Sequence, residues 1–300
     1  MSISEIAVYI EAIATNSSLY EEKNFDNRIE AIDFIGFDII DQIDELLRET
    51  GQPVKFVSLK DRAEKLKSAL EEIDSNLFQR IREDIRMGDC RGQAFKNMVN
   101  AYVDVNASCH HRLGEAGYDN LDIFINGLSL IRAMPEQTKD LEPEMVYYQK
   151  TPARVVFELV RECHFTKEDV FFDLGSGLGQ VAILVNLLTG ITAKGVEFEP
   201  AFCEYAGDCA AELNLSNVTF INMDARKANY SKGTIFFMYT PFKGEILQEV
   251  LAILRKESLR RKIKIITYGP CTAQVALESW LDFATPGESN MYKLGIFSSI

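Results

Sequence analysis

The sequence lacks the cysteine pattern of a disulfide-stabilised or metal-binding protein. Its six cysteines are scattered along 300 residues, and none forms a Cys-x-x-Cys pair. This spacing fits reduced thiols rather than a disulfide framework. The run Cys109-His110-His111 carries metal-binding side chains, but consecutive residues of a helix point in different directions and cannot easily converge on one ion. We therefore predict no metal site.

A long apolar run and a basic N-terminal region are also missing. No stretch approaches the roughly 20 apolar residues that a membrane-spanning helix needs. The first residues contain Glu5 and Glu11, whereas a signal peptide would begin with basic residues. We expect a soluble, cytoplasmic protein with no membrane partner.

Positive charge is the third deficit. The formal net charge is −13; residues 1–150 carry 17 Lys/Arg against 28 Asp/Glu, and residues 151–300 carry 15 against 17. A protein that follows a phosphate backbone needs a basic surface, so nucleic acid is a disfavoured partner. The acidic first half can attract a basic partner, although acidic helices usually serve solubility alone.

The residues that are present divide the chain into two predicted domains. Residues 1–134 read as an all-helical N-terminal domain, and the polar, proline-bearing stretch 135–144 follows it. Ser58 and Asp61 resemble a capping box that would open the second helical segment. Apolar residues at helical spacing mark segments 32–47, 58–87, 92–111 and 120–133.

Residues 135–300 alternate strands with helices, which predicts a parallel sheet covered by helices on both faces. The last two strands are expected to form an antiparallel hairpin through Pro286-Gly287. This α/β, Rossmann-like, seven-stranded and mostly parallel sheet resembles the class I methyltransferase fold. Strands are expected at Val170–Leu174, Ala193–Phe198, Val218–Met223, Thr234–Tyr239, Ile263–Tyr268, Leu281–Ala284 and Tyr292–Ser298.

The stretch VFFDLGSGLGQV, residues 170–181, is the most informative part of the chain. A buried strand, a glycine turn and a helix start form a cradle of nucleotide size, in which Gly175, Ser176 and Gly177 are expected to contact the ligand. A dinucleotide fingerprint would need glycine where Gln180 stands, and no P-loop lysine follows. An acid at the strand end, Asp173, suits an ammonium group better than a pyrophosphate. S-adenosylmethionine carries an ammonium, a sulfonium and no phosphate, so we predict a site for this methyl donor.

The next two strands also end in acids. Glu197 falls at the spacing expected of a residue that binds the ribose hydroxyls, and Phe198 beside it can pack on adenine. After the third strand, Asp224 can accept from the adenine amino group while Ala225 packs on the ring. The carboxyl ends of parallel strands meet at one edge of the sheet. Asp173, Glu197 and Asp224 are therefore expected to form one site.

The methyl acceptor is expected at the end of the fourth strand, in Tyr239-Thr240-Pro241-Phe242. Tyr239 and Thr240 are the candidate catalytic residues, because each can offer a hydroxyl. A role in shaping the pocket wall is the alternative. Methyl transfer asks mainly for alignment, and positioning alone can supply roughly 7–11 kcal/mol of the barrier, so a missing general base does not argue against activity.

Residues 145–206 resemble the core of the disruptor-of-telomeric-silencing (DOT1) family of histone lysine methyltransferases. The resemblance implies that Tyr148 and Thr151 cover the methionine end of the methyl donor and that Gln180 contacts it. It also implies that Asp173 and Gly175 contact the donor, that Glu197 binds its ribose, and that the pair Asp224-Ala225 contacts its adenine. Lys150 stands where the family has glutamate, and Met238 and Tyr239 stand where it has asparagines. The matching residues are Val146-Tyr-Tyr-Gln-Lys-Thr151, Asp169–Val181, Gly195-Val-Glu197 and Tyr205-Ala206.

Three functions follow as hypotheses. The first is an S-adenosylmethionine-dependent methyltransferase acting on a protein side chain, with lysine as one candidate. The second keeps the fold and the methyl donor but takes a small-molecule acceptor. The third is a non-catalytic S-adenosylmethionine-binding module, which the three intact acids argue against.

Overall fold

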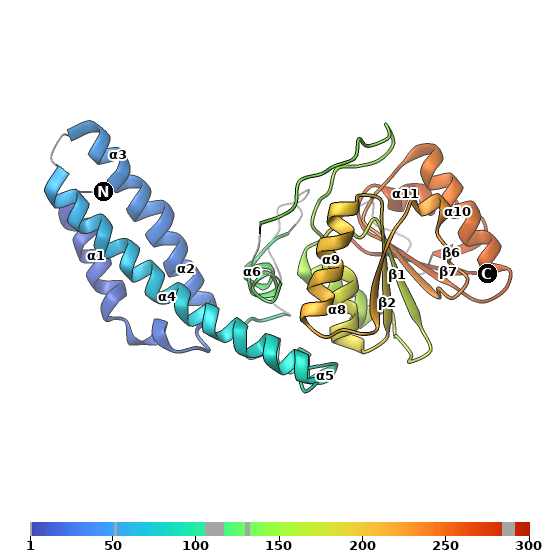
Figure 1. The fold of residues 1–300 in the computed structure, drawn as a ribbon, viewed down its shortest axis with the longest axis horizontal. Helices are drawn as coiled ribbons and strands as arrows, with labels where there is room; N and C mark the ends of the chain where they lie inside the picture. The colour runs from blue at the N-terminus through green and yellow to red at the C-terminus, as the bar shows by residue number, and fades with distance from the viewer. Residues whose placement is uncertain (1, 51–52, 106–116, 130–132, 284–291) are drawn as a thin grey trace.

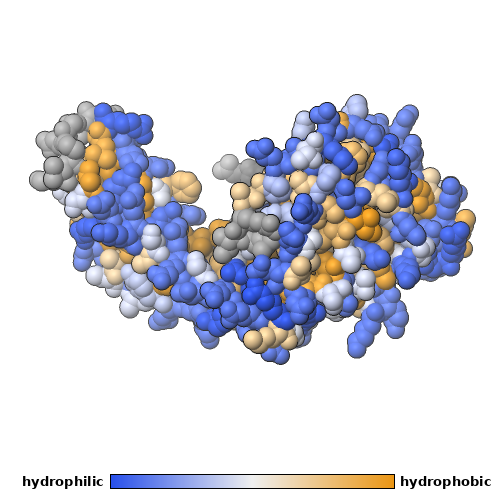
Figure 2. Space-filling model, viewed as in Figure 1, coloured by the Kyte–Doolittle hydropathy of each residue, from blue (hydrophilic) through white to orange (hydrophobic). Residues whose placement is uncertain are grey.

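A computed structural model describes residues 2–50, 53–105, 117–129, 133–283 and 292–300. An elongated helical arm stands at one end of the molecule and an α/β part at the other (Figure 1). The visible surface of the arm is mostly hydrophilic, and a hollow separates it from the α/β part (Figure 2). Cys109-His110-His111, Ala284 and the Pro286-Gly287 turn lie outside the described residues.

The arm is a bundle built along one long helix, α4. Apolar residues of α4 are buried at intervals of three and four, among them Leu59, Leu66, Leu70 and Leu77, and this spacing keeps one face of a helix against its neighbours. The bundle consists of α1 (Ile3–Thr15), the 3₁₀ turn η1 (Ser17–Tyr20), α2 (Phe25–Asp33), the π-helical η2 (Phe34–Ile40), α3 (Asp41–Thr50) and α4 (Pro53–Met87).

Several expected helix boundaries in this half are wrong. The helix expected to open at a Ser58 capping box begins at Pro53, because proline suits the first helical turn. The segment expected at 92–111 is helical only over α5 (Gln93–Asn100) within the described residues. The segment expected at 120–133 ends as α6 (Asn120–Gly127). A π-helical stretch, η2, interrupts the segment expected at 32–47.

The α/β part is a seven-stranded sheet in the order β3-β2-β1-β4-β5-β7-β6, parallel except at β7. The predicted α/β class is confirmed, and each expected strand is present with ends no more than three residues from those predicted. The strands are β1 (Val170–Leu174), β2 (Thr192–Glu197), β3 (Val218–Asn222), β4 (Ile235–Met238), β5 (Lys264–Thr267), β6 (Leu281–Phe283) and β7 (Gly295–Ser299).

Alternating side chains of the central strands enter two different cores. Phe171 and Phe237 point into the core on the α7 and α8 side, whereas Phe172 and Phe236 point into the core under α10. This period of two is what a sheet buried on both faces requires. The covering helices are α7 (Ala153–Glu162), α8 (Gln180–Thr189), α9 (Pro200–Glu212), α10 (Gly244–Ser258) and α11 (Cys271–Val275), together with the short turn η3 (Ala225–Lys227).

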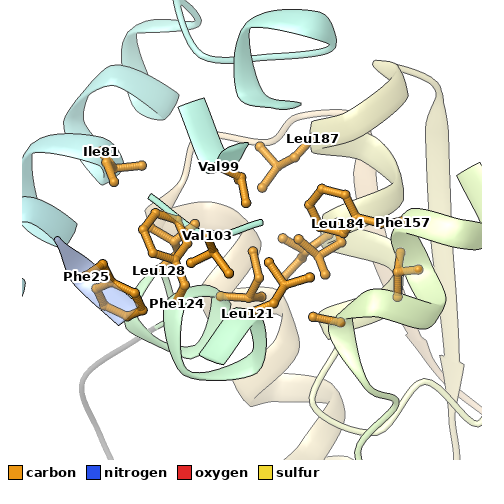
Figure 3. Packing of buried hydrophobic residues seen from close by; sticks show 14 of the residues in the cluster. Phe25, Ile81, Val99, Val103, Leu121, Phe124, Leu128, Phe157, Leu184 and Leu187 are labelled. Carbon is orange, nitrogen blue, oxygen red and sulfur yellow. The ribbon is translucent and has the colours of Figure 1, made fainter. Parts of the chain in front are cut away.

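One apolar cluster runs from the arm into the α/β part. It includes Phe25 and Ile81 of the arm, Phe124 of α6 and Leu184 of α8. Figure 3 shows Phe25 and Ile81 at one side of this cluster, Leu184 at the other, and Phe124 between them. The predicted boundary at residues 134 and 135 therefore falls in a chain whose two parts share buried surface, and that boundary remains a prediction.

A carboxylate of α6 caps the first helix of the α/β part. Helix α7 begins after Pro152, which has no side chain able to cap it. The buried Asp122 carboxylate accepts instead from the Ala153 N–H at 2.8 Å. Its other oxygen accepts from the Asp119 N–H at 3.0 Å. Burial raises the pKa of Asp122, and these two bonds act in the opposite direction.

We predict that Asp122→Ala lowers the free energy of unfolding by about 1–3 kcal/mol, because it removes a helix cap and leaves buried N–H groups without a partner. Urea unfolding measures the change. The matched control is Glu204→Ala on α9, an exposed acid, for which we expect a change within about 0.5 kcal/mol. Equal effects of the two substitutions would contradict the capping role.

Candidate methyl-donor site

A cavity lies at the carboxyl edge of β1, β2, β3 and β4, where a site is expected in an open α/β sheet. We call residues 137–149 the strap, because they supply the wall of the cavity opposite the strands. From the strap come Gln137, Leu141 and Met145 to Gln149; from the sheet and its loops come Gly175, Val196 to Glu199, Phe202, Met223 to Ala225, Tyr239 to Phe242 and Ile246.

Two glycines of the turn after β1, Gly175 and Gly177, have no space for a side chain. Gly175 and Gly177 adopt φ angles of 74° and 50°, in the left-handed region that favours glycine. A Cβ on Gly177 would lie 2.2 Å from the ring of Tyr148, and one on Gly175 would lie 2.2 Å from Pro241. Tyr148 also packs against Phe202, with ring centroids 5.6 Å apart. The strap and the β4 loop therefore pack directly against the backbone of the turn.

Asp173 is buried at the end of β1, and its Oδ2 has no hydrogen-bond partner within the described residues. Burial raises the pKa of this carboxyl group to about 8, and the nearby Glu197 carboxylate adds to the shift. An unpaired buried acceptor is costly. A ligand ammonium group at this position would remove that cost and favour the ionised acid.

Two more polar atoms of the turn lack partners in the described part of the chain. They are Ser176 Oγ and Gln180 Oε1. The amide nitrogen of Gln180 lies 3.5 Å from the Thr151 carbonyl oxygen, and Thr151 itself is buried. The predicted residues Thr151, Asp173, Ser176, Gly177 and Gln180 thus gather behind the cavity wall rather than on its open surface.

Glu197 joins the ends of β1 and β2. One carboxylate oxygen accepts from the Gly177 N–H at 2.7 Å and the other from the Glu199 N–H at 2.8 Å. Burial raises the pKa of Glu197, while these backbone bonds oppose the shift. Each oxygen keeps a second lone pair, so the carboxylate is held in a fixed orientation and can still accept from two hydroxyl groups.

Asp224 follows β3 and is held by an arginine. Its oxygens lie 3.0 Å from Arg226 Nε, and its Oδ2 lies 2.6 Å from a terminal nitrogen of the same side chain. This pairing lowers the pKa of Asp224. Phe198, the other residue expected at the adenine end, carries the Lys139 ammonium 4.4 Å from its ring centroid.

At the acceptor end Tyr239 and Phe242 line the cavity, and two further tyrosine rings continue from Tyr239 into the core. Tyr239 lies against Tyr268 with ring centroids 5.0 Å apart, and Tyr292 lies 6.0 Å beyond Tyr268. Burial raises the pKa of Tyr239 well above its ordinary value. Its hydroxyl therefore stays protonated at neutral pH and can position a group but not act as a general base.

Thr240 is strained and its hydroxyl is already engaged. Its φ is 43°, a conformation that β-branched residues rarely adopt. The hydroxyl accepts from the Cys271 N–H at 3.2 Å and lies 3.4 Å from the Tyr268 carbonyl oxygen. These contacts tie the β4 loop to the β5 loop. They favour a positioning role for Thr240 over the hydroxyl chemistry expected from the sequence.

The sequence analysis expected Tyr148 of the strap to cover the donor, but it missed the earlier part of the strap and its main anchor. The buried Glu199 carboxylate accepts from both the N–H and the hydroxyl of Thr138, at 2.9 and 2.6 Å, and from the Lys139 N–H at 2.8 Å. It also caps α9 through Ala201 at 3.1 Å. An acid directly before Pro200 could have predicted that Glu199 caps α9. Nothing in the sequence indicated that Glu199 also binds Thr138 and Lys139, some 60 residues earlier.

Lys150, which departs from the family pattern, turns toward the helical half. Its ammonium group donates to the Asn126 side chain on α6. Burial lowers the pKa of Lys150, and the Asp122 carboxylate opposes this shift. The positive charge at position 150 thus links α6 to the segment that precedes α7.

Two further observations concern the described residues only. No group of three His, Cys, Asp or Glu side chains lies close enough together there to hold a metal ion. Nor does any of their helices combine the length and apolar character needed to cross a membrane.

Fold, site and sequence together define an S-adenosylmethionine-dependent methyltransferase of class I. Residues 141–268, slightly less than half of the chain, match the family model described as "Histone methylation protein DOT1". This match confirms the predicted DOT1-like core, the enzyme class and the methyl donor. A search of curated proteins returned no match.

Two solved structures that are similar to part of this chain carry the description of a methyltransferase. An RNA methyltransferase from Salinibacter ruber, in complex with S-adenosyl-L-homocysteine, has 21% identity and a TM-score of 0.41 over 50% of this chain and 92% of its own. A SAM-dependent methyltransferase from Aquifex aeolicus has 16% identity and a TM-score of 0.38 over 48% and 89%.

The residues present fit S-adenosylmethionine, which supplies an activated methyl group on its sulfonium when bound. The fit rests on the unpartnered oxygens of Asp173, Ser176 and Gln180 and on the oriented Glu197 carboxylate. Asp173 would hold the ammonium group and Glu197 the ribose hydroxyls. The rings of Tyr148 and Phe202 would exclude water from the turn.

We predict that methyl-donor affinity rises with pH through the titration of Asp173. The free carboxyl group is mostly protonated below its pKa of about 8, whereas the bound ammonium group favours the ionised form. Binding then releases up to one proton, and the Kd falls by up to about thirtyfold from pH 6 to 7.5. Isothermal titration in two buffers of different ionisation enthalpy measures the affinity and the proton.

The control for this experiment is Asp173→Asn, which keeps the shape but cannot titrate. We expect weak binding with no slope between pH 6 and 7.5. A wild-type affinity that does not change with pH, or an equal slope in the variant, would contradict the role of Asp173.

Proposed function

We propose that this enzyme transfers the methyl group to an amino group of a protein side chain, with lysine as the leading candidate. The observation that carries the proposal is the Tyr239 ring, which lines the cavity at the acceptor end and is held there by the buried Tyr268 ring. Electron-rich ring faces attract ammonium and methylammonium groups. The "Histone methylation protein DOT1" match over this region supports the same acceptor class.

The cavity wall supports a macromolecular acceptor as well. Strap residues Val146 and Tyr147 line the cavity yet are 40% and 78% exposed, and Met223 on the opposite side is 40% exposed. A site with exposed walls can admit a side chain that remains attached to a folded protein. A metabolite would instead be expected in a cavity that buries most of its surface.

Under this proposal the chain positions rather than activates. The protonated Tyr239 hydroxyl can donate a hydrogen bond at the acceptor end, and its ring limits the directions from which an amine approaches. Thr240 holds the loop that carries Tyr239 by its bonds to the β5 loop. The strap excludes water from the other side. Alignment of nucleophile, methyl group and sulfur is the main demand of this reaction.

The test uses a methyl-labelled S-adenosylmethionine with three acceptor pools: core histones, total cell protein and a filtrate of small metabolites. We expect label in protein, recovered as methyl-lysine after acid hydrolysis. Label found only in the small-molecule filtrate would overturn the proposal in favour of a small-molecule methyltransferase. The absence of label in every pool would favour a non-catalytic module.

Two substitutions of Tyr239 test the role of its ring. Tyr239→Phe keeps the ring, and we expect kcat to stay within about fivefold of the wild type; Tyr239→Ala should lower kcat by about 10–100-fold, because it removes the ring face. Methyl-donor Kd should change less than about twofold in both. A loss of donor binding in Tyr239→Ala would instead assign this residue to the donor site.

A further inference from the structure

The strap lies over the cavity, and three acidic side chains, Glu199, Glu144 and Glu142, fasten it to the core in addition to the Met145–Phe242 bridge. Glu199 binds its first residues through the backbone of Thr138 and Lys139. Near its middle the Glu144 carboxylate accepts from the Ile246 N–H at the start of α10, at 2.9 Å, and the Glu144 carbonyl accepts from the Lys243 N–H at 2.9 Å. The third fastening is made by side chains alone.

This third fastening is the chain of three charges Glu142, Arg226 and Asp224. Arg226 lies 2.6 Å from Glu142 of the strap and 2.6 Å from Asp224 at the cavity wall. It meets Asp224 through both Nε and a terminal nitrogen, and this two-pronged contact fixes the plane of the carboxylate. Asp224 is nearly buried, while the side chain of Glu142 is 46% exposed.

The Glu144 fastening does not reach a residue expected to touch the methyl donor, and Glu199 reaches Glu197 through its backbone N–H alone. The fastening at Arg226 reaches the donor site through its own side chain, because Asp224 is the residue proposed to accept from the adenine amino group. Arg226 therefore does two things with one side chain. It holds the strap down through Glu142, and it orients the acceptor that reads the adenine end.

We propose that Arg226 is a positioning residue that couples closure of the strap to recognition of adenine by Asp224. The proposal rests on the assignment of Asp224 to the adenine end within the donor site. When the donor occupies the cavity, the oriented carboxylate and the held strap retain it together. Loss of Arg226 frees both, so the donor and its product leave faster while the acceptor end is unchanged.

The experiment measures dissociation of S-adenosylhomocysteine by stopped-flow fluorescence and steady-state kinetics with the methyl donor. Glu142→Gln removes the strap contact alone, and we expect dissociation two to five times faster, as for a half-exposed ion pair. Arg226→Met removes both contacts, and we expect at least tenfold faster dissociation. KM for the donor should rise in the same proportion, with kcat within about twofold of the wild type.

A double variant separates coupling from a general loss of structure. If Glu142 acts through Arg226, the pair Glu142→Gln with Arg226→Met dissociates no faster than Arg226→Met alone. Effects that multiply would overturn the coupling. Arg260→Met is the matched control, because Arg260 is 71% exposed and pairs with Glu257 on α10, away from the cavity; its dissociation rate should equal that of the wild type.

The outcomes also separate this inference from the assignment of the methyl donor. If the wild type binds S-adenosylhomocysteine and neither Glu142→Gln nor Arg226→Met changes its dissociation, the inference is wrong and the donor site stands. If the wild type fails to bind it, both are wrong. Should Arg226→Met unfold, Glu142→Gln decides the matter, because its exposed side chain is not needed for folding.

Discussion

The structure depends on one steric constraint, the lack of space for a Cβ at Gly175 and Gly177 in the turn after β1. Because Gly175 and Gly177 carry no Cβ, Pro241 and Tyr148 can lie directly on the backbone. The same bareness lets the Gly177 N–H reach Glu197 on the next strand. The β4 loop, the strap and the end of β2 therefore converge on a single point.

Several buried polar groups around that point lack a hydrogen-bond partner within the described residues. Asp173, Ser176 and Gln180 each leave an oxygen without a partner, and burial keeps Asp173 largely protonated near neutral pH. Such groups oppose the stability of the free protein and favour a ligand with matching donors. At the acceptor end the groups are aromatic and already packed. The donor end of the cavity thus offers unpartnered oxygens to a ligand, and the acceptor end offers packed aromatic rings.

Local patterns in the sequence were enough to predict the strands, the glycine turn and the three strand-end acids, because each depends on neighbours along the chain. Contacts between distant segments had no such signal. Glu199 binding Thr138, Arg226 binding Glu142 and Asp122 capping α7 all join residues that only the fold brings together. The helical half was predicted less well, since helix ends depend on packing as much as on caps. The start of α4 at Pro53 rather than Ser58 is one example.

The close packing of the strap on the glycine turn is tested most directly by Gly177→Ala. The added Cβ would meet the Tyr148 ring in a left-handed backbone conformation, whereas Gly207→Ala on α9 has no atom within 4 Å of its added Cβ. Titration of both folded variants with S-adenosylmethionine is the measurement. We predict that Gly177→Ala weakens binding at least about tenfold and that Gly207→Ala binds like the wild type. Wild-type affinity in Gly177→Ala would contradict the central role of the turn.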